Sequence, residues 1–283
     1  MQREDKKMMV FQIAVDTLIE GKTINTYAFS DFLECYSEKN FETIVTKRIK
    51  KSGKKDVTYQ MVLDKITESV VLSEAGYYIV NFAKRVKGLS IDKLAVAIIK
   101  TRRTELIIDL ACIKGAPVEK LAKVICEKGY IKEVINFAKK VPNAPIELLE
   151  NDLIKKASET EEYDMRKFLV DFAKTIKEAN ITKLEDVIIS FKQPNLIYEF
   201  AKNVERANIN KMVDAIIKLK ARNYYKTFIA DINNISEDNI KKLVIDMKKD
   251  GYCGDLLDLL TLEKFPEDIA EDVIKYAITK KLK

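Results

Sequence analysis

Apolar residues recur along most of this chain at the spacing of a helix that buries one side. Ile91, Leu94 and Ile98 show this spacing. It returns in three later segments, at Val118, Leu121 and Ile125, at Ile181, Leu184 and Ile188, and at Ile209, Met212 and Ile216. Residues at these intervals form one apolar stripe on an α-helix. No segment sustains the alternation of apolar and polar residues typical of a strand, so the pattern predicts an all-α protein.

A second helical pattern comes before each of these stripes. It contains an aromatic or aliphatic marker residue at Phe82, Leu110, Phe137, Phe172, Phe200 and Ile229, with spacings of 28, 27, 35, 28 and 29 residues. An alanine follows every marker, and a small side chain there lets neighbouring helices approach while the marker fills the core. A fixed period indicates units that bury their apolar faces against their neighbours. The sequence therefore predicts an αα-repeat superhelix, or α-solenoid, of about 28-residue units over residues 76–283.

Residues between the predicted helices agree with this division into pairs. Ser90, Asn180, Asn208 and Ser236 stand where a side-chain oxygen can cap the first free N–H groups of the second helix of a pair. Pro117 suits the first turn of a helix, as does Pro145, because a missing N–H costs nothing there. Single glycines at Gly88, Gly115 and Gly129 separate helices.

Two segments depart from the regular period. The spacing of 35 residues places about seven additional residues near Ser158–Asp164, and we expect a longer loop or an added turn there, with a possible contact role. The repeat pattern is missing from residues 1–75, where the sequence predicts helices over 10–20, 41–49 and 59–72. This segment is expected to be an atypical helical cap on the array or a small helical domain.

These patterns resemble the short αα-repeat solenoids, the HEAT-like class of curved helical arrays. The resemblance covers residues 76–283 and rests on the Phe-Ala-Lys sequences and the apolar stripes described above. It implies an extended surface that binds other macromolecules, and it points to no single family or activity. The units are shorter than ordinary HEAT or TPR units, and the Trp/Gly/Tyr pattern of TPR repeats is absent.

Composition narrows the functional classes. The 283 residues are 47% apolar and 33% charged, as in a folded soluble protein, and the longest apolar run, residues 94–99, is too short to span a membrane. The charged N-terminus does not resemble a signal peptide, so we expect a cytoplasmic location and no membrane partner. Four separated cysteines predict free thiols, with the thiols of Cys112 and Cys126 buried; the other two are Cys35 and Cys253.

The chain contains no histidine and no glycine-rich phosphate loop. The absence of histidine excludes Ser-His and Cys-His catalysis and histidine metal sites. No group of residues supplies a preorganised catalytic site. We therefore expect a protein that is not an enzyme, with no catalytic residues, cofactor, metal or small-molecule substrate.

Three charged groups are candidate contact surfaces. The first is a basic segment expected to be a solvated loop, formed by Lys47, Arg48, Lys50, Lys51, Lys54 and Lys55. The second is a basic column near the ends of the second helices, formed by Lys100, Lys155, Lys218 and Lys249. The third is a polar and acidic column on the first helices, formed by Asn81, Asp109, Asn136, Asp171 and Glu199. Basic surfaces suit phosphates or an acidic protein, but solvated helix faces have the same composition.

The favoured hypothesis is a non-enzymatic α-solenoid that binds a protein or ribonucleoprotein as an adaptor or inhibitor. The lysine- and isoleucine-rich composition suggests a bacterial or phage origin and a role in defence conflict. The alternative is a nucleic-acid-binding solenoid that uses the basic segment and the basic column. Stacking on bases needs exposed rings, for which Tyr77, Tyr78, Tyr224 and Tyr225 are the candidates. The least favoured hypothesis is a metal-dependent hydrolase built on Asp109, Asp171 and Glu199.

Overall fold

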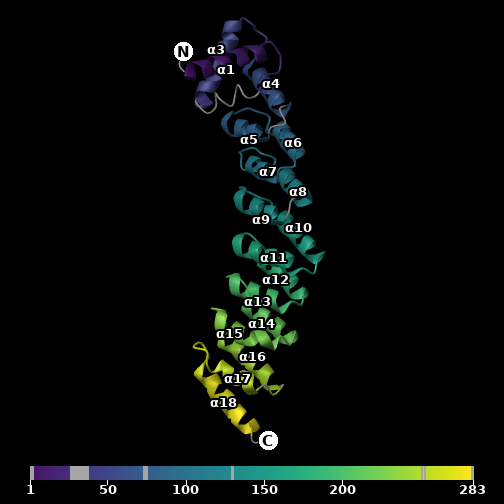
Figure 1. Cartoon of the computed structure of the whole chain (residues 1–283), viewed down its shortest axis with the longest axis vertical. Coiled ribbons are helices and arrows are strands. Elements are labelled where there is room, and N and C mark those ends of the chain that lie inside the picture. Colours follow the sequence, from purple (N-terminus) through teal and green to yellow (C-terminus); the bar gives the residue numbers. More distant parts are fainter. Residues whose placement is uncertain are drawn as a thin grey trace. The chain divides into compact units, whose positions relative to one another are not determined.

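A computed structural model describes residues 3–25, 38–72, 76–128, 131–249, 251 and 253–281 of the chain. All regular structure in these ranges is helical, and they contain no strand (Figure 1). The prediction of an all-α protein is confirmed. No helix in these ranges combines the length and the apolar character that crossing a membrane requires.

The chain divides into two compact units, residues 1–145 and residues 146–283. The helices described in the first unit are α1 (Arg3–Ile19), α3 (Glu38–Ser52), α4 (Tyr59–Leu72), α5 (Gly76–Arg85), α6 (Ile91–Thr101), α7 (Thr104–Ala111), α8 (Val118–Lys128) and α9 (Ile131–Lys140). Those of the second unit are α10 (Ile146–Ser158), α11 (Tyr163–Thr175), α12 (Ile181–Ser190), α13 (Pro194–Asn203), α14 (Ile209–Lys218), α15 (Tyr225–Asp231), α16 (Glu237–Lys249), α17 (Cys253–Leu259) and α18 (Glu267–Lys281). A single 3₁₀ turn, η1 (Arg222–Tyr224), precedes α15.

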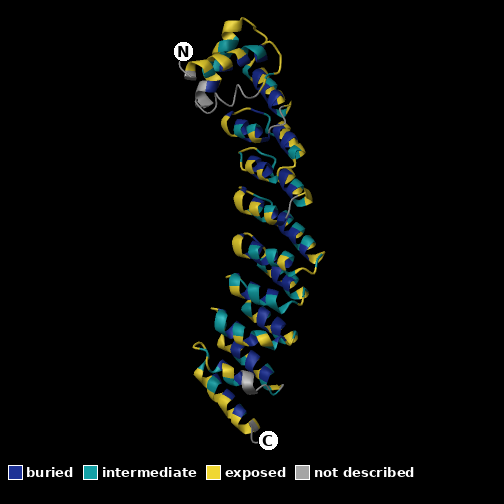
Figure 2. Cartoon of the chain, in the orientation of Figure 1, coloured by how far each residue is buried: buried dark blue, intermediate teal, exposed yellow. Residues whose placement is uncertain are grey.

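Within each unit, helices pack against the next helix in the sequence and also against the next but one. In the first unit α5 contacts α7, which contacts α9, while α4 contacts α6, which contacts α8. In the second unit α11 contacts α13, and α12, α14, α16 and α18 form a series of contacts. The helices consequently bury one side and expose the other (Figure 2). This arrangement explains the apolar stripes of the sequence.

The marker residues form the core of both units. Phe82, Leu110, Phe137, Phe172 and Phe200 all have 0% exposure. The last marker is Phe228 and not Ile229. The N–H of Ile232, the residue after α15, donates to the Phe228 carbonyl. The N–H of Val204, the residue after α13, donates to the Phe200 carbonyl in the same way. Both Phe228 and Ile229 are buried, so burial alone does not separate them. The spacing from Phe200 is therefore 28 residues, one fewer than the sequence pattern predicted.

The predicted caps are confirmed at three of four positions. The Asn180 side chain accepts from the N–H of Lys183 at 3.1 Å, and the Asn208 side chain accepts from the N–H of Lys211 at 3.2 Å. Ser236 accepts from the N–H of Asn239 in the same way. Ser90 is the residue before α6, but its side chain makes no capping hydrogen bond.

The additional residues of the long period are accommodated mainly as helix. α10 and α11 have 13 residues each, against 10 in α9, α12, α13 and α14. Only residues 159–162 lie between α10 and α11. The expected longer loop is therefore not formed, and the additional residues lengthen α10 and α11.

The three helices predicted at the N-terminus are present as α1, α3 and α4. They contact one another, and the rings of Phe11 and Phe41 lie 5.6 Å apart in their shared core. α4 also contacts α5 and α6 of the same unit.

Buried carboxylates join alternate helices of the second unit, which the sequence did not predict. Glu150 of α10 is 2% exposed and accepts from the N–H of Asn180, the cap of α12, at 2.8 Å. Glu185 of α12 is 3% exposed and accepts from the N–H of Asn208, the cap of α14, at 2.6 Å. Each carboxylate thus satisfies a free N–H at the start of the second helix after its own.

Candidate macromolecule-binding surfaces

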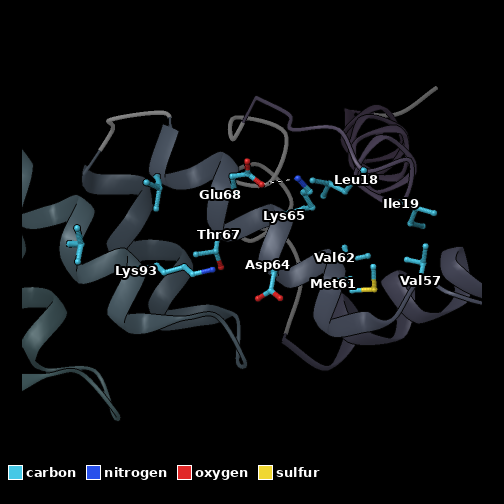
Figure 3. Close-up of a pocket in the computed structure, with 13 residues that line it drawn as sticks. Leu18, Ile19, Val57, Met61, Val62, Asp64, Lys65, Thr67, Glu68 and Lys93 are labelled. Atoms are coloured by element: carbon cyan, nitrogen blue, oxygen red, sulfur yellow. Dashed lines mark hydrogen bonds and ion pairs between the residues drawn. The ribbon is translucent and has the colours of Figure 1, made fainter.

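An apolar groove of about 570 Å³ opens on the first unit between α1, α4 and α6. Leu18 and Ile19 of α1 lie across from Val57, Met61 and Val62 at the start of α4 (Figure 3). α6 contributes the remaining wall through Lys93 and Val96. Helices α1 and α6 both contact α4, which contributes most of the lining residues.

Exposed apolar side chains distinguish this groove from an ordinary surface depression. Met61 is 49% exposed and Val96 is 42% exposed. Polar side chains of α4 also line the groove. Lys65 pairs with Glu68 at 2.8 Å (Figure 3), and Asp64 accepts a hydrogen bond from Gln60. A mainly apolar groove with a few charged groups is typical of surfaces that bind a partner side chain or helix.

The basic segment of residues 47–55 is not the loop that the sequence predicted. Lys47, Arg48, Lys50 and Lys51 belong to the last turns of α3, which continues to Ser52. Basic side chains are favourable at the C-terminal end of a helix dipole, so they do not end the helix. Gly53, with a φ of 71°, ends it instead. Only Lys54 and Lys55 lie in the connection to α4.

Two cations of this segment are used within the protein. Arg48 forms an ion pair with Asp16 of α1, and the Lys54 ammonium donates to the Ile19 carbonyl at 3.2 Å. Lys47, Lys50, Lys51 and Lys55 are exposed. The segment therefore divides into two residues that hold α3 and its following turn against α1 and four that face solvent.

The lysines of the predicted basic column are all exposed, but they are distributed over the two units. Lys100 lies near the end of α6 in the first unit. The others belong to the second unit, Lys155 in α10, Lys218 at the end of α14 and Lys249 at the end of α16. The predicted position near the ends of the second helices is correct for each of them.

Three further basic residues, which the sequence pattern did not identify, follow second helices of the predicted pairs. The turns that follow α6, α12 and α14 place Arg102, Lys192 and Lys220 in the left-handed conformation, with φ of 58°, 54° and 54°. In each turn the N–H of the basic residue donates to the carbonyl three residues earlier. Glycine is the usual residue at such a position, so the sequence contains no signal for the turn.

The polar and acidic column is divided between the two units. Asp109 belongs to the first unit, whereas Asp171 and Glu199 belong to the second. Glu199 accepts a hydrogen bond from the Asn203 side chain at 2.8 Å. No group of three or more acidic, cysteine or histidine side chains in the described ranges could hold a metal ion.

The four tyrosines expected to offer stacking surfaces differ widely in exposure. Tyr77 is 64% exposed, and its ring lies 6.2 Å from that of Tyr78, which is half-buried. Tyr224 is half-buried. Tyr225 is completely buried and donates to Asp246, so the prediction is wrong for this residue. Burial raises the pKa of the Tyr225 hydroxyl, and the hydrogen bond to Asp246 raises it further.

Both cysteines predicted to be buried are more accessible than expected. Cys112 is exposed and Cys126 is half-buried, and neither forms a disulfide. Cys112 stands two residues after the marker Leu110, the position that the outward-facing Lys84, Lys139 and Lys174 occupy in other pairs. Partial burial followed by the charge of Asp109 raises the pKa of the Cys112 thiol, so the thiolate is disfavoured at neutral pH.

A polar network links α13 to α15 in the second unit. The Lys202 ammonium donates to Asp231 at 2.7 Å and to the Tyr198 hydroxyl at 2.8 Å. Hydrogen bonding to Asp231, then to Tyr198, raises the pKa of Lys202, and the same bond from Lys202 lowers the pKa of Asp231. Lys202 therefore stays protonated, and its charge is balanced by the carboxylate of Asp231.

Comparisons of the chain with models of protein families, with characterised proteins and with solved structures find no match.

Proposed function

We propose that the chain is a non-enzymatic α-solenoid that binds a protein or ribonucleoprotein as an adaptor or inhibitor. The observation that carries this proposal is the open apolar groove between α1, α4 and α6. A preformed groove on packed helices costs little ordering entropy when a partner binds, which suits stoichiometric binding.

The occupant of the groove is an amphipathic helix of the partner protein. Apolar side chains one turn apart on such a helix can contact Met61 and Val96. Methionine adapts its shape to different apolar partners. Asp64 and Lys93 in the lining provide opposite charges that fix the orientation of a helix with polar flanks.

The repeat architecture is part of the same proposal. Three observations support a 28-residue unit. Alternate helices contact one another. The caps and the markers recur at intervals of 28 residues, as in the caps Asn180, Asn208 and Ser236 and the markers Phe172, Phe200 and Phe228. The first three described helices then form the atypical cap.

Deletion of residues 180–207 tests this repeat. It joins Ala179 directly to Asn208, so that Asn208 takes the place of Asn180. Helix α14 then follows α11 in the position that α12 occupies in the wild type. We expect a folded protein with the same helical fraction by circular dichroism and cooperative thermal unfolding. Deletion of residues 180–193 removes one helix alone and should abolish cooperative unfolding. Loss of folding in both deletions would reject the 28-residue unit.

Charge placed in the groove should prevent partner binding. The double variant Met61→Lys and Val96→Lys introduces two cations among apolar side chains, and we expect at least a tenfold loss of affinity. The matched control is Ile245→Lys with Ile274→Lys, at side chains 53% and 43% exposed in the second unit. Affinity is measured with a partner recovered from the source cells, with and without nuclease treatment.

Three results would reject the groove as the binding site for a partner helix. The first is equal binding by wild type and the groove variant. The second is equal loss in the groove variant and the control. The third is concentration-dependent dimerisation of the wild type, removed by the groove substitutions, because the groove would then join two copies of this chain.

The alternative function, nucleic-acid binding, has support from a different surface of the first unit, described in the next section. No arrangement among the described residues favours the hydrolase hypothesis.

A further inference from the structure

Tyr77 is unusual among the aromatic residues that the structure describes. It is 64% exposed, whereas every other described aromatic side chain is buried or half-buried. Its neighbour Tyr78 holds it in an edge-to-face contact, with an angle of 74° between the rings. The ring is therefore supported on one side and open to solvent on another.

The start of α5 packs closely against the turn between α6 and α7. A Cβ atom added at Gly76 would lie 2.5 Å from Leu106 Cδ1 and 3.4 Å from Thr101 Cγ2. The backbone next to Tyr77 is therefore in contact with the last residue of α6 and the first turn of α7. Glycine at position 76 permits this approach.

The end of α6 and the turn that follows it carry three exposed cations. Lys100, Arg102 and Arg103 are exposed, and none of them has an ion-pair partner in the described part of the chain. Two hydrogen bonds fix the turn, from Arg102 N–H to the Ile99 carbonyl and from Arg103 N–H to Thr101 Oγ1. The cations thus extend from a defined backbone, next to the residues that pack against Gly76, which precedes Tyr77.

We propose that Tyr77, Lys100, Arg102 and Arg103 form a binding site for single-stranded nucleic acid. The Tyr77 ring offers a face on which an unpaired base can stack. The two guanidinium groups can bind phosphate oxygens in a bidentate manner, and Lys100 adds a point charge. This combination of an open ring and unpaired cations is the one that single strands require.

Other polyanions fit this surface less well. An acidic protein would use the three cations but would gain little from the exposed ring. A duplex presents phosphates, but its bases are stacked inside and cannot reach Tyr77. The requirement for both the ring and the charges therefore identifies a single strand.

The charge distribution along the sequence supports this assignment. Residues 1–145 contain 26 lysine and arginine residues against 18 aspartate and glutamate residues, whereas residues 146–283 contain 24 against 26. The net positive charge of the protein is thus carried by the first unit. An excess of positive charge there accelerates association with a polyanion.

The test uses the full chain and a fluorescently labelled single-stranded oligonucleotide of mixed sequence, as RNA and as DNA, in an anisotropy titration. Arg102→Gly with Arg103→Gln should weaken binding at least tenfold and reduce the slope of log affinity against log salt by about 1 to 2. Tyr77→Leu should weaken binding at least fivefold with an unchanged slope, because it removes stacking and no charge.

Lys192→Gly is the matched control, because Lys192 occupies the same left-handed turn after α12 and is also exposed. It should leave the affinity unchanged. Arg102→Gly replaces a left-handed arginine with the residue that adopts this conformation most readily, so it should not lower the melting temperature. Loss of binding in a folded variant can then be assigned to the site.

Four outcomes would overturn the proposal. They are absence of single-strand binding at low salt, an equal loss in Lys192→Gly, unchanged binding in Tyr77→Leu, and duplex or polyglutamate binding as tight as that of the single strand. The site does not depend on the groove. A groove variant that no longer binds its protein partner should still bind the oligonucleotide. The experiments therefore test the two proposals independently.

Discussion

Replacing Phe137 with alanine is expected to lower the free energy of unfolding by about 3 to 5 kcal/mol. Phe137 is fully buried in α9, and α7 and α8 pack against that helix. Removing the ring leaves a cavity that neighbouring helices fill only in part. The change is measured by urea denaturation followed by circular dichroism at a helical band.

Lys139→Ala is the control for this substitution. Lys139 belongs to the same helix two residues later and is exposed, so the change should alter stability by less than about 0.5 kcal/mol. Equal destabilisation by the two variants would mean that the buried side of α9 has been assigned incorrectly.

Glu185→Ala is expected to lower the free energy of unfolding by about 1 to 3 kcal/mol. The buried carboxylate accepts from the N–H of Asn208 at 2.6 Å and from the Lys211 ammonium at 3.3 Å. Without the carboxylate, the N–H at the start of α14 loses its acceptor. The same denaturation experiment provides the measurement.

Asp186→Ala provides the comparison at the adjacent residue. Asp186 also pairs with Lys211, at 2.7 Å, but its side chain is 67% exposed. An exposed pair contributes about 0 to 1 kcal/mol, so this variant should remain close to wild type. A larger loss in Asp186→Ala than in Glu185→Ala would show that the ion pair to Lys211 matters more than the buried cap.

The sequence predicted those features of the fold that depend on local pattern. The stripe of Ile209, Met212 and Ile216 identified α14 because a helix that packs on one side repeats its apolar residues at the helical spacing. The caps at Asn180 and Asn208 were recognisable because asparagine has a specific preference for that position. The register of the sixth pair was displaced by one residue because Phe228 and Ile229 are both apolar and both buried.

Features that depend on contacts between distant residues could not be predicted. A glutamate within a helix usually faces solvent, and nothing near Glu185 in the sequence indicates that it caps a helix 23 residues later. The apolar groove requires Leu18, Met61 and Val96 to meet from three helices. The left-handed turn at Arg102 has no glycine to signal it. Of the proposed nucleic-acid site, only Tyr77 and Lys100 were recognisable in advance.

The buried carboxylates of α10 and α12 also affect how the second unit opens. The backbone N–H of Asn180 donates to Glu150, and the backbone N–H of Asn208 donates to Glu185. A side chain of an earlier helix therefore protects each backbone N–H from solvent. Hydrogen exchange at these amides therefore requires separation of two helices and not simple fraying of one end. Local opening in this unit should consequently spread from one helix pair to the next.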